Sequence, residues 1–272
     1  MKLFTLLSRV SLAACAAVLL VAASVRAEEP APAPAGVTAA PAEAAAPAAE
    51  PTMQEKMEDM LKKLVAKASK VTNYTVNFTK QELVKGKWGE LETVLMKHQK
   101  TPHCVYMKWL KDPYKDRETI FCKGWNKDEI KAHEGGFLKY VVVSLDPLGS
   151  MAMKGNRHSV LEAGIHHTVE LITKDFEHGK KVGGVNFEKY GEQKVRGQDS
   201  LCVKVNQTKD PKAGFYAGAA EICVSKALFL PTSVKIWDFN GTLIEHYTYA
   251  DYKVNPGLTQ KDFDPENPEY AY

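Results

Sequence analysis

The sequence predicts an α+β domain made of one long, strongly curved antiparallel sheet, with a helix at its start and a helical segment inserted midway. Apolar residues recur at helical spacing near residue 60 and again near residue 165. Almost everywhere else they alternate with polar residues at a period of two, and short turns join the alternating segments. So many consecutive strands must curl, either into a barrel or around a helix. The order of the elements leaves both arrangements open.

The first 27 residues predict a secretory signal peptide. Lys2 and Arg9 supply positive charge, an apolar run follows to about Val25, and small residues surround a cleavage point at residue 27. The run is short for a bilayer span of ~20 residues. A lipid anchor at Cys15 is a minor alternative, because the apolar run continues past this cysteine. We therefore expect export to the periplasm.

The mature chain carries no net charge. Residues 1–27 hold three basic residues and no acids, which leaves 36 − 3 = 33 basic and 33 acidic residues. Such a balance argues against a nucleic-acid partner. Residues 28–51 are rich in Ala and Pro and predict an extended tether. Residues 52–272 are long enough for a single domain with a full core.

Taken in order, the elements of this domain begin with an amphipathic helix from Met53 to about Ser69. A change to period two then predicts a meander of strands. The tail, residues 261–272, is polar and broken by prolines, so we expect it on the surface. The expected strands are 74–79, 91–95, 105–109, 140–145, 185–195, 199–208, 219–226, 231–238 and 243–253, and the second helix is expected at 158–178.

The four cysteines of the mature domain predict two disulfides, since an even number in an oxidising compartment favours pairing. Each pair gives a sensible hairpin register. The first places Lys108 opposite Glu118, and the second places Lys204 opposite Glu221. Four buried free thiols remain the alternative. The expected bridges are Cys104–Cys122 and Cys202–Cys223.

No familiar catalytic or nucleotide-binding motif occurs, and we expect neither enzymatic activity nor a cofactor. One candidate metal site lies on the second predicted helix, where His158, Glu162 and His166 follow at intervals of four. Residues at this spacing share one side of a helix and are able to ligate a transition metal. Gly164 interrupts the helix, and a solvated polar face explains the pattern equally well.

Three stretches carry a resemblance to a known family: VYMKWLKDP (105–113), LDPLGSMAMKGNRHSVLEAGI (145–165) and NPGLTQKDFDPENPEY (255–270). They resemble an uncharacterised bacterial family with a LolA-like fold. The order of elements is similar to that of the LolA/LolB/RseB superfamily of outer-membrane lipoprotein carriers. This resemblance implies an unclosed β-barrel, lined with apolar side chains and lidded by helices, that holds acyl chains.

The predicted function is a non-enzymatic binding or carrier protein for a lipid, a lipoprotein acyl chain or another apolar ligand on the concave face. Arg157 and His158 are expected at its rim, where the arginine could pair with a phosphate head group. The sequence does not decide which alternate residues of each strand point into the concave face. If the other set points inward, Tyr106 and Ile120 line the pocket. The expected lining residues are Met107, Trp109, Phe121, Tyr140, Val142, Met151 and Met153.

The expected partners follow from this prediction. They are a lipid or an acylated protein, with the chain at most peripheral to a membrane. An alternative function is an envelope sensor or protein-interaction module, in which the same groove meets an envelope protein.

Overall fold

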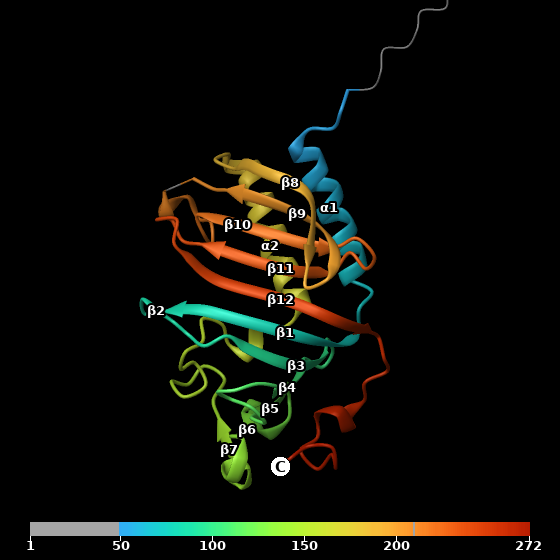
Figure 1. Cartoon of the computed structure of the whole chain (residues 1–272), viewed down its shortest axis with the longest axis vertical. Coiled ribbons are helices and arrows are strands. Elements are labelled where there is room, and N and C mark those ends of the chain that lie inside the picture. Colours follow the sequence, from blue (N-terminus) through green and yellow to red (C-terminus); the bar gives the residue numbers. More distant parts are fainter. Residues whose placement is uncertain (1–48, 209) are drawn as a thin grey trace, which may run out of the picture. The chain divides into compact units, whose positions relative to one another are not determined.

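One antiparallel sheet of 12 strands organises the computed structural model, which describes residues 49–208 and 210–272 (Figure 1). The strand order is β7-β6-β5-β4-β3-β1-β12-β11-β10-β9-β8, and β2 pairs with β1 alone. Because β7 and β8 lie at opposite ends of this order, the sheet is not closed, which confirms the predicted fold class. The strands are β1 (Asn73–Val84), β2 (Lys87–Trp88), β3 (Glu92–Gln99), β4 (Cys104–Trp109), β5 (Glu118–Cys122), β6 (Ile130–His133), β7 (Val143–Leu145), β8 (Asn186–Val195), β9 (Gln198–Asn206), β10 (Ala219–Ser225), β11 (Pro231–Trp237) and β12 (Leu243–Val254).

The predicted signal peptide, and the tether except for its last three residues, lie outside the described residues. Within residues 49–208 and 210–272, no helix combines the length and the apolar character needed to cross a membrane. The five strands predicted between residues 185 and 253 all form, with ends within two residues of the prediction.

The first helix, α1 (Met53–Ala68), forms where predicted. Thr52 and Glu55 make a capping box, in which each side chain bonds the other's backbone amide and satisfies the start of the helix. The apolar stripe of α1 packs with the second helix against one face of the sheet. We call this the concave face and the opposite one the convex face.

The second helix, α2, runs from Ile165 to Val182. The sequence predicted a start at residue 158, so the helix begins later than predicted. Gly164 ends the preceding segment with a φ of 111°, a conformation that L side chains rarely adopt. A Cβ at this position would also lie 2.5 Å from Nε2 of His98. His158 and Glu162 therefore belong to the loop before α2, and the predicted metal-binding stripe on one helix does not form.

The buried strand predicted at 140–145 is a second correction. Residues Gly136–Tyr140 form a 3-10 turn, and only β7 is extended. β7 is an edge strand of the sheet, and its residues are exposed or half-buried. Tyr140 is 79% exposed.

Both predicted disulfides are present. They join β4 to β5 and β9 to β10 in the expected registers, with Lys108 opposite Glu118 and Lys204 opposite Glu221. Because side chains alternate along a strand, the cysteines face away from their core neighbours Val105 and Val203. The bridges therefore lie on the convex face and leave the concave face unaffected.

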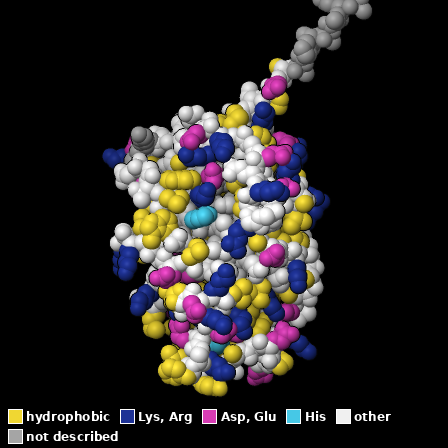
Figure 2. Space-filling model, in the orientation of Figure 1, with side chains coloured by type: hydrophobic (Ala, Val, Ile, Leu, Met, Phe, Trp, Pro, Cys, Tyr) yellow, Lys and Arg dark blue, Asp and Glu magenta, His cyan; other side chains and the backbone are white. Residues whose placement is uncertain are grey.

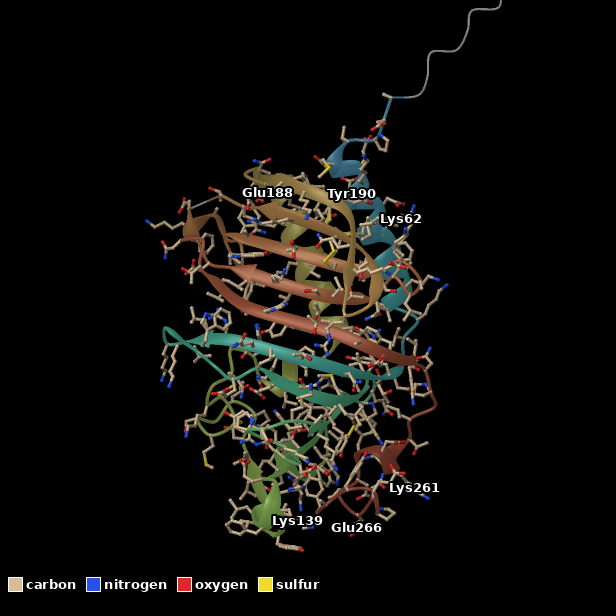
Figure 3. The ribbon with its side chains drawn as sticks, in the orientation of Figure 1. Lys62, Lys139, Glu188, Tyr190, Lys261 and Glu266 are labelled. Atoms are coloured by element: carbon tan, nitrogen blue, oxygen red, sulfur yellow. A yellow bond between two sulfur atoms is a disulfide. The ribbon has the colours of Figure 1, made fainter. Side chains whose placement is uncertain are left out.

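The C-terminal tail was expected on the surface, but part of it is buried against the sheet. Phe263 is fully buried, and it packs with Tyr106 and Ile120 on the convex face of β4 and β5. The Tyr270 ring stacks on that of Tyr106 with 4.0 Å between centroids. Figure 3 labels Lys261 and Glu266 on this tail, beside the lower half of the sheet. Tyr106 and Ile120 thus lie under the tail and do not face the concavity.

Phe263→Ala should lower the free energy of unfolding by about 3 kcal/mol, because the truncation leaves a cavity among buried aromatic rings. Urea titration followed by circular dichroism measures this value. Phe137→Ala is the matched control, since Phe137 is 83% exposed and its loss should change stability by less than about 0.5 kcal/mol. Equal effects of the two changes would show that the tail contributes nothing to the fold.

Candidate functional site: an apolar cavity crossed by a buried polar cluster

A cavity of about 870 Å³ lies between the concave face of the sheet, α2 and the segment that precedes α2. Its volume falls within the range of about 300–1,000 Å³ that is usual for ligand pockets. We call residues 146–164 the lid loop. The sheet and α2 both contribute apolar side chains to the wall, among them Phe78, Val94, Ile130, Ile172, Phe176 and Val234.

The alternation of side chains in β4 produces one wall. Met107 and Trp109 point into the cavity, whereas Tyr106 points to the convex face. In the register with β3, Met107 lies opposite Met96 and Trp109 opposite Val94. A strand with a period of two can serve both faces in this way because successive side chains point to opposite sides.

The structure brings together only some of the predicted lining residues. Met107, Trp109 and Met151 line the cavity. Phe121 lies on the same side of the sheet but is buried in a small cluster with Ile130. The other predicted lining residues that lie outside the cavity wall are Tyr140, Val142 and Met153.

The stretch around β7 lines the cavity with the residues that the prediction passed over. Val141, Val143 and Leu145 face the cavity, whereas Val142 is outside the wall. The sequence predicted a buried strand here, and its nearly continuous apolar run gives no sign of which residues face the cavity. The sequence neighbours of the predicted Tyr140 and Val142 therefore line the cavity in their place.

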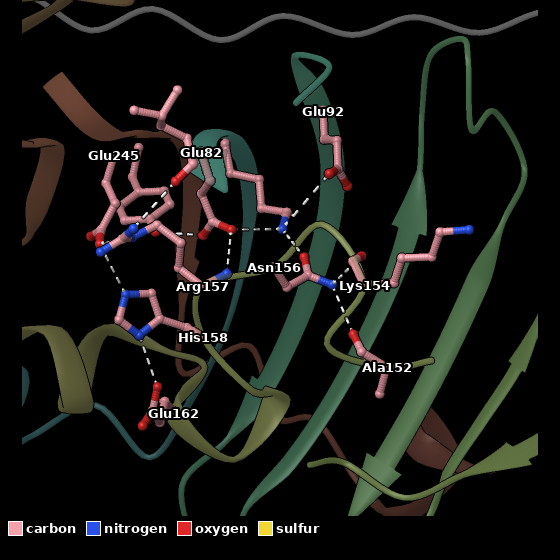
Figure 4. Close-up of polar contacts among 12 residues, drawn as sticks. Glu82, Glu92, Ala152, Lys154, Asn156, Arg157, His158, Glu162 and Glu245 are labelled. Atoms are coloured by element: carbon pink, nitrogen blue, oxygen red, sulfur yellow. Dashed lines mark hydrogen bonds and ion pairs between the residues drawn. The ribbon is translucent and has the colours of Figure 1, made fainter. Parts of the chain in front are cut away.

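Two buried glutamates lie in the cavity wall on adjacent strands, Glu82 on β1 and Glu245 on β12. Buried carboxylates need partners, because their charge loses its hydration. Arg157 Nε donates to Glu245 at 2.7 Å, and the Tyr216 hydroxyl donates to it at 2.5 Å. Glu82 accepts from the Tyr247 hydroxyl at 2.5 Å and from the Arg157 amide at 2.9 Å. Figure 4 shows Arg157 between Glu82 and Glu245.

The cluster continues across the sheet towards β3. Lys80 Nζ lies 3.7 Å from a carboxylate oxygen of Glu82 and 3.7 Å from one of Glu92, and it donates to Asn156 of the lid loop (Figure 4). Trp109 Nε1 donates to Glu92 at 2.5 Å. A line of polar groups therefore interrupts a wall that is predominantly, though not entirely, apolar. The sequence offered one signal for it, namely charged residues at inward positions of long strands.

His158 sits between two carboxylates. Its Nδ1 lies 2.8 Å from Glu162 and its Nε2 3.4 Å from Glu245. Burial acts to lower the pKa of His158, but the hydrogen bond and charge of Glu245 outweigh it and raise the pKa to about 9. Burial likewise acts to raise the pKa of Glu245, yet hydrogen bonds from His158 and Tyr216 outweigh it and lower that pKa. The pair is therefore an imidazolium and a carboxylate near neutral pH.

Arg157, predicted at the rim for a head group, is already engaged. Its Nη1 donates to the Leu83 carbonyl at 3.2 Å, in addition to the contact with Glu245. The side chain attaches the lid loop to β1 and β12. Of the two predicted rim residues, His158 lines the cavity and Arg157 does not.

The candidate metal ligands have separate partners. His166 Nε2 lies 2.9 Å from the Val71 carbonyl, whereas His158 and Glu162 contact each other. In the part of the chain that the structure describes, no three His, Cys, Asp or Glu side chains are placed to hold a metal ion.

Comparisons with known proteins match this chain to one family and to several solved structures. Residues 71–272 match the model of a family described as "Protein of unknown function (DUF1571)". No curated protein is similar enough to count as a match. Solved structures with a similar arrangement exist, at low sequence identity.

Three of these structures are lipoprotein LppX of Mycobacterium tuberculosis, the MucA/MucB complex of Pseudomonas aeruginosa, and a LolA superfamily protein of Nitrosomonas europaea. The first has 13% identity and a TM-score of 0.44 and covers 77% of this chain and 98% of that one. The second has 13% identity and a TM-score of 0.44, with 77% and 60% covered. The third has 9% identity and a TM-score of 0.30, with 76% and 96% covered. At these values the likeness bears on the fold and not on function.

Glu245→Gln should lower the pKa of His158 from about 9 towards or below its ordinary value, because the amide removes the negative charge. Titration of the imidazole proton signals by NMR measures this. A raised pKa means that the protonated histidine stabilises the folded state below about pH 6.5, and this stabilisation is lost as the pH rises through about 9. The variant should lack this loss of stability between the two values.

Glu162→Gln is the matched control for that change. The Glu162 side chain is 45% exposed, so its charge is screened by water and its removal should lower the pKa of His158 less. If the Glu245 variant left the pKa of His158 where it is in the unchanged protein, the imidazolium–carboxylate pair would not exist.

Proposed function

Because the chain belongs to DUF1571, a family of proteins of unknown function, its role has to be inferred from the cavity, and we propose that it is a non-enzymatic periplasmic binding or carrier protein. The ligand we propose is a lipid, a lipoprotein acyl chain or another apolar molecule held against the concave face. The supporting observation is an apolar cavity of about 870 Å³ between the sheet and α2.

The energetics support an apolar ligand. Each methylene that leaves water gains about 0.8 kcal/mol, so a chain of about 16 carbons would gain roughly 13 kcal/mol before the costs of association. The inward residues of β4, Met107 and Trp109, would contact such a chain. Methionine and tryptophan suit this role, because a flexible thioether and a large ring adapt to chains of different shape.

The polar cluster gives the ligand an orientation. His158 lines the cavity and carries a positive charge near neutral pH. Its contact with Glu162 lies near the surface, where a ligand oxygen is able to replace it. We therefore propose that His158 meets an ester or phosphate oxygen of the ligand. Arg157 and His158 both contact Glu245. Arg157 thereby fixes the carboxylate that His158 faces.

The proposed location follows from the covalent chemistry. Both disulfides join adjacent strands, and such bridges persist in oxidising compartments such as the periplasm. The predicted signal peptide at residues 1–27 agrees with this location. The proposal places the chain outside the cytoplasm, where lipids and acylated proteins have to pass through water between membranes.

Native mass spectrometry of protein purified from the periplasm tests the proposal, and we expect a lipid-sized adduct on the intact protein. Ala220→Trp should raise the dissociation constant about tenfold, equivalent to about 1.4 kcal/mol, and so lower the occupied fraction, because the new ring fills part of the cavity. Ala66→Trp is the matched control, since Ala66 is exposed on α1. It should leave the adduct unchanged.

Two results would overturn this function. One is an unchanged protein without any adduct, and the other is an Ala220 variant with as much adduct as the unchanged protein. An empty cavity together with a co-purifying envelope protein would instead support the sensor or interaction module.

A further inference from the structure

The segment from Phe137 to Met151 exposes large apolar side chains beside the cavity. Phe137 is 83% exposed, Tyr140 79%, Leu148 67% and Met151 69%. We call these four residues, together with Val142, the mouth patch. Figure 2 shows hydrophobic side chains gathered at the lower end of the molecule, where Figure 1 places β6 and β7. Figure 3 labels Lys139 at the same end.

The same segment forms the cavity wall with its inner side. Leu138, Val141, Val143 and Leu145 line the cavity, and the first three are themselves partly open to solvent at 42%, 58% and 37%. Their neighbours Phe137, Tyr140 and Val142 are exposed outside the cavity. The wall is therefore one segment thick and apolar on both sides. A wall that met only water on its outer side would carry polar residues there, because soluble proteins rarely expose large contiguous apolar patches.

The mouth patch itself carries few charges, and the exposed Glu90 and Glu134 line the cavity outside it. Residues 135–153 contain only Lys139 and Asp146 as charged residues. The Asp146 carboxylate accepts the Leu148 amide at 2.9 Å. Lys139 Nζ lies over the Tyr140 ring at 5.1 Å, and the exposed Lys154 follows at the cavity rim. Among the described residues, neither lysine has a carboxylate within ion-pair distance.

We propose that the mouth patch docks on the surface of an anionic phospholipid bilayer. Phe137, Tyr140 and Leu148 would enter the boundary between head groups and acyl chains, and Lys139 and Lys154 would meet lipid phosphates. Aromatic, aliphatic and basic side chains on one surface suit this boundary. The cavity then opens towards an apolar phase, and a ligand passes between bilayer and cavity without crossing water.

The choice of a membrane over a protein partner rests on the proposed function, because an apolar ligand has to be exchanged with a bilayer. A second copy of the chain is the competing occupant. β7 ends the sheet and has one free edge, to which another strand could pair. The experiment below separates the two.

Flotation of the mature protein with vesicles tests the docking. One set of vesicles contains phosphatidylcholine alone, and the other contains phosphatidylcholine with phosphatidylglycerol. The unchanged protein should float with the anionic vesicles, and less so at high salt, because screening weakens the lysine contacts. The double change Phe137→Ser and Tyr140→Ser should lower the partition coefficient at least about tenfold through the loss of apolar contact.

The matched control is the double change Val182→Ser and Leu228→Ser. Val182 is 55% exposed and Leu228 37% exposed, and both lie outside the mouth patch. This variant should float like the unchanged protein. Because all four side chains are exposed, we expect both variants to fold, and circular dichroism verifies this.

Three results would overturn the docking. The first is that the unchanged protein does not float with anionic vesicles. The second is that the Phe137 and Tyr140 variant floats as well as the unchanged protein. In the third, the unchanged protein is a dimer that this variant dissociates, and neither floats, so the patch joins two copies. Native mass spectrometry of the same samples keeps the two proposals apart. An adduct without flotation contradicts docking alone, whereas flotation without an adduct contradicts the proposed ligand alone.

Discussion

The contact between Arg157 and Glu245 joins the lid loop to the middle of the sheet, and the cavity depends on this contact. Glu245 is 2% exposed, so without its cationic partners it would be an uncompensated buried charge. Removing one partner of a fully buried pair typically costs about 3–5 kcal/mol, and the loss of Arg157 should cost less because its side chain is 30% exposed and His158 still faces Glu245. The Arg157 amide also bonds Glu82 on the neighbouring strand. One residue of the loop is therefore held by β1 and β12 together.

The stabilising contacts on the convex face leave the concave face available for a ligand. Both disulfides lie on that side, as does the tail packed through Phe263. α1 and α2 pack in one cluster with inward side chains of β1, β3, β4 and β9 to β12. The cavity remains between the sheet, α2 and the lid loop, and strands from both halves of the sheet line it. A strongly curved sheet with too few layers to fill its concavity therefore keeps an internal volume.

Local patterns predicted much of this fold, and long-range partners account for what was missed. The strands after residue 185 and both cysteine registers follow from alternation and from opposite charges across a hairpin. The late start of α2 depends on Gly164 packing against His98, which belongs to a distant strand. The polar cluster escaped prediction for the same reason, since Arg157 and Glu245 lie 88 residues apart. Alternation gives the two sides of a strand but not which side a cavity takes, so the lining around β7 was one residue out of register.

A cavity lined by apolar side chains is costly in water, because collapse of its walls would gain contacts. The polar cluster opposes such collapse. Glu82, Glu92 and Glu245 bind their partners at fixed distances across the wall, and Lys80 links two of these carboxylates to the lid loop. Moving the lid loop would break its contacts with Lys80, Glu82 and Glu245, and these groups would lose polar partners. These few charges therefore hold the lid loop to the sheet beside the cavity.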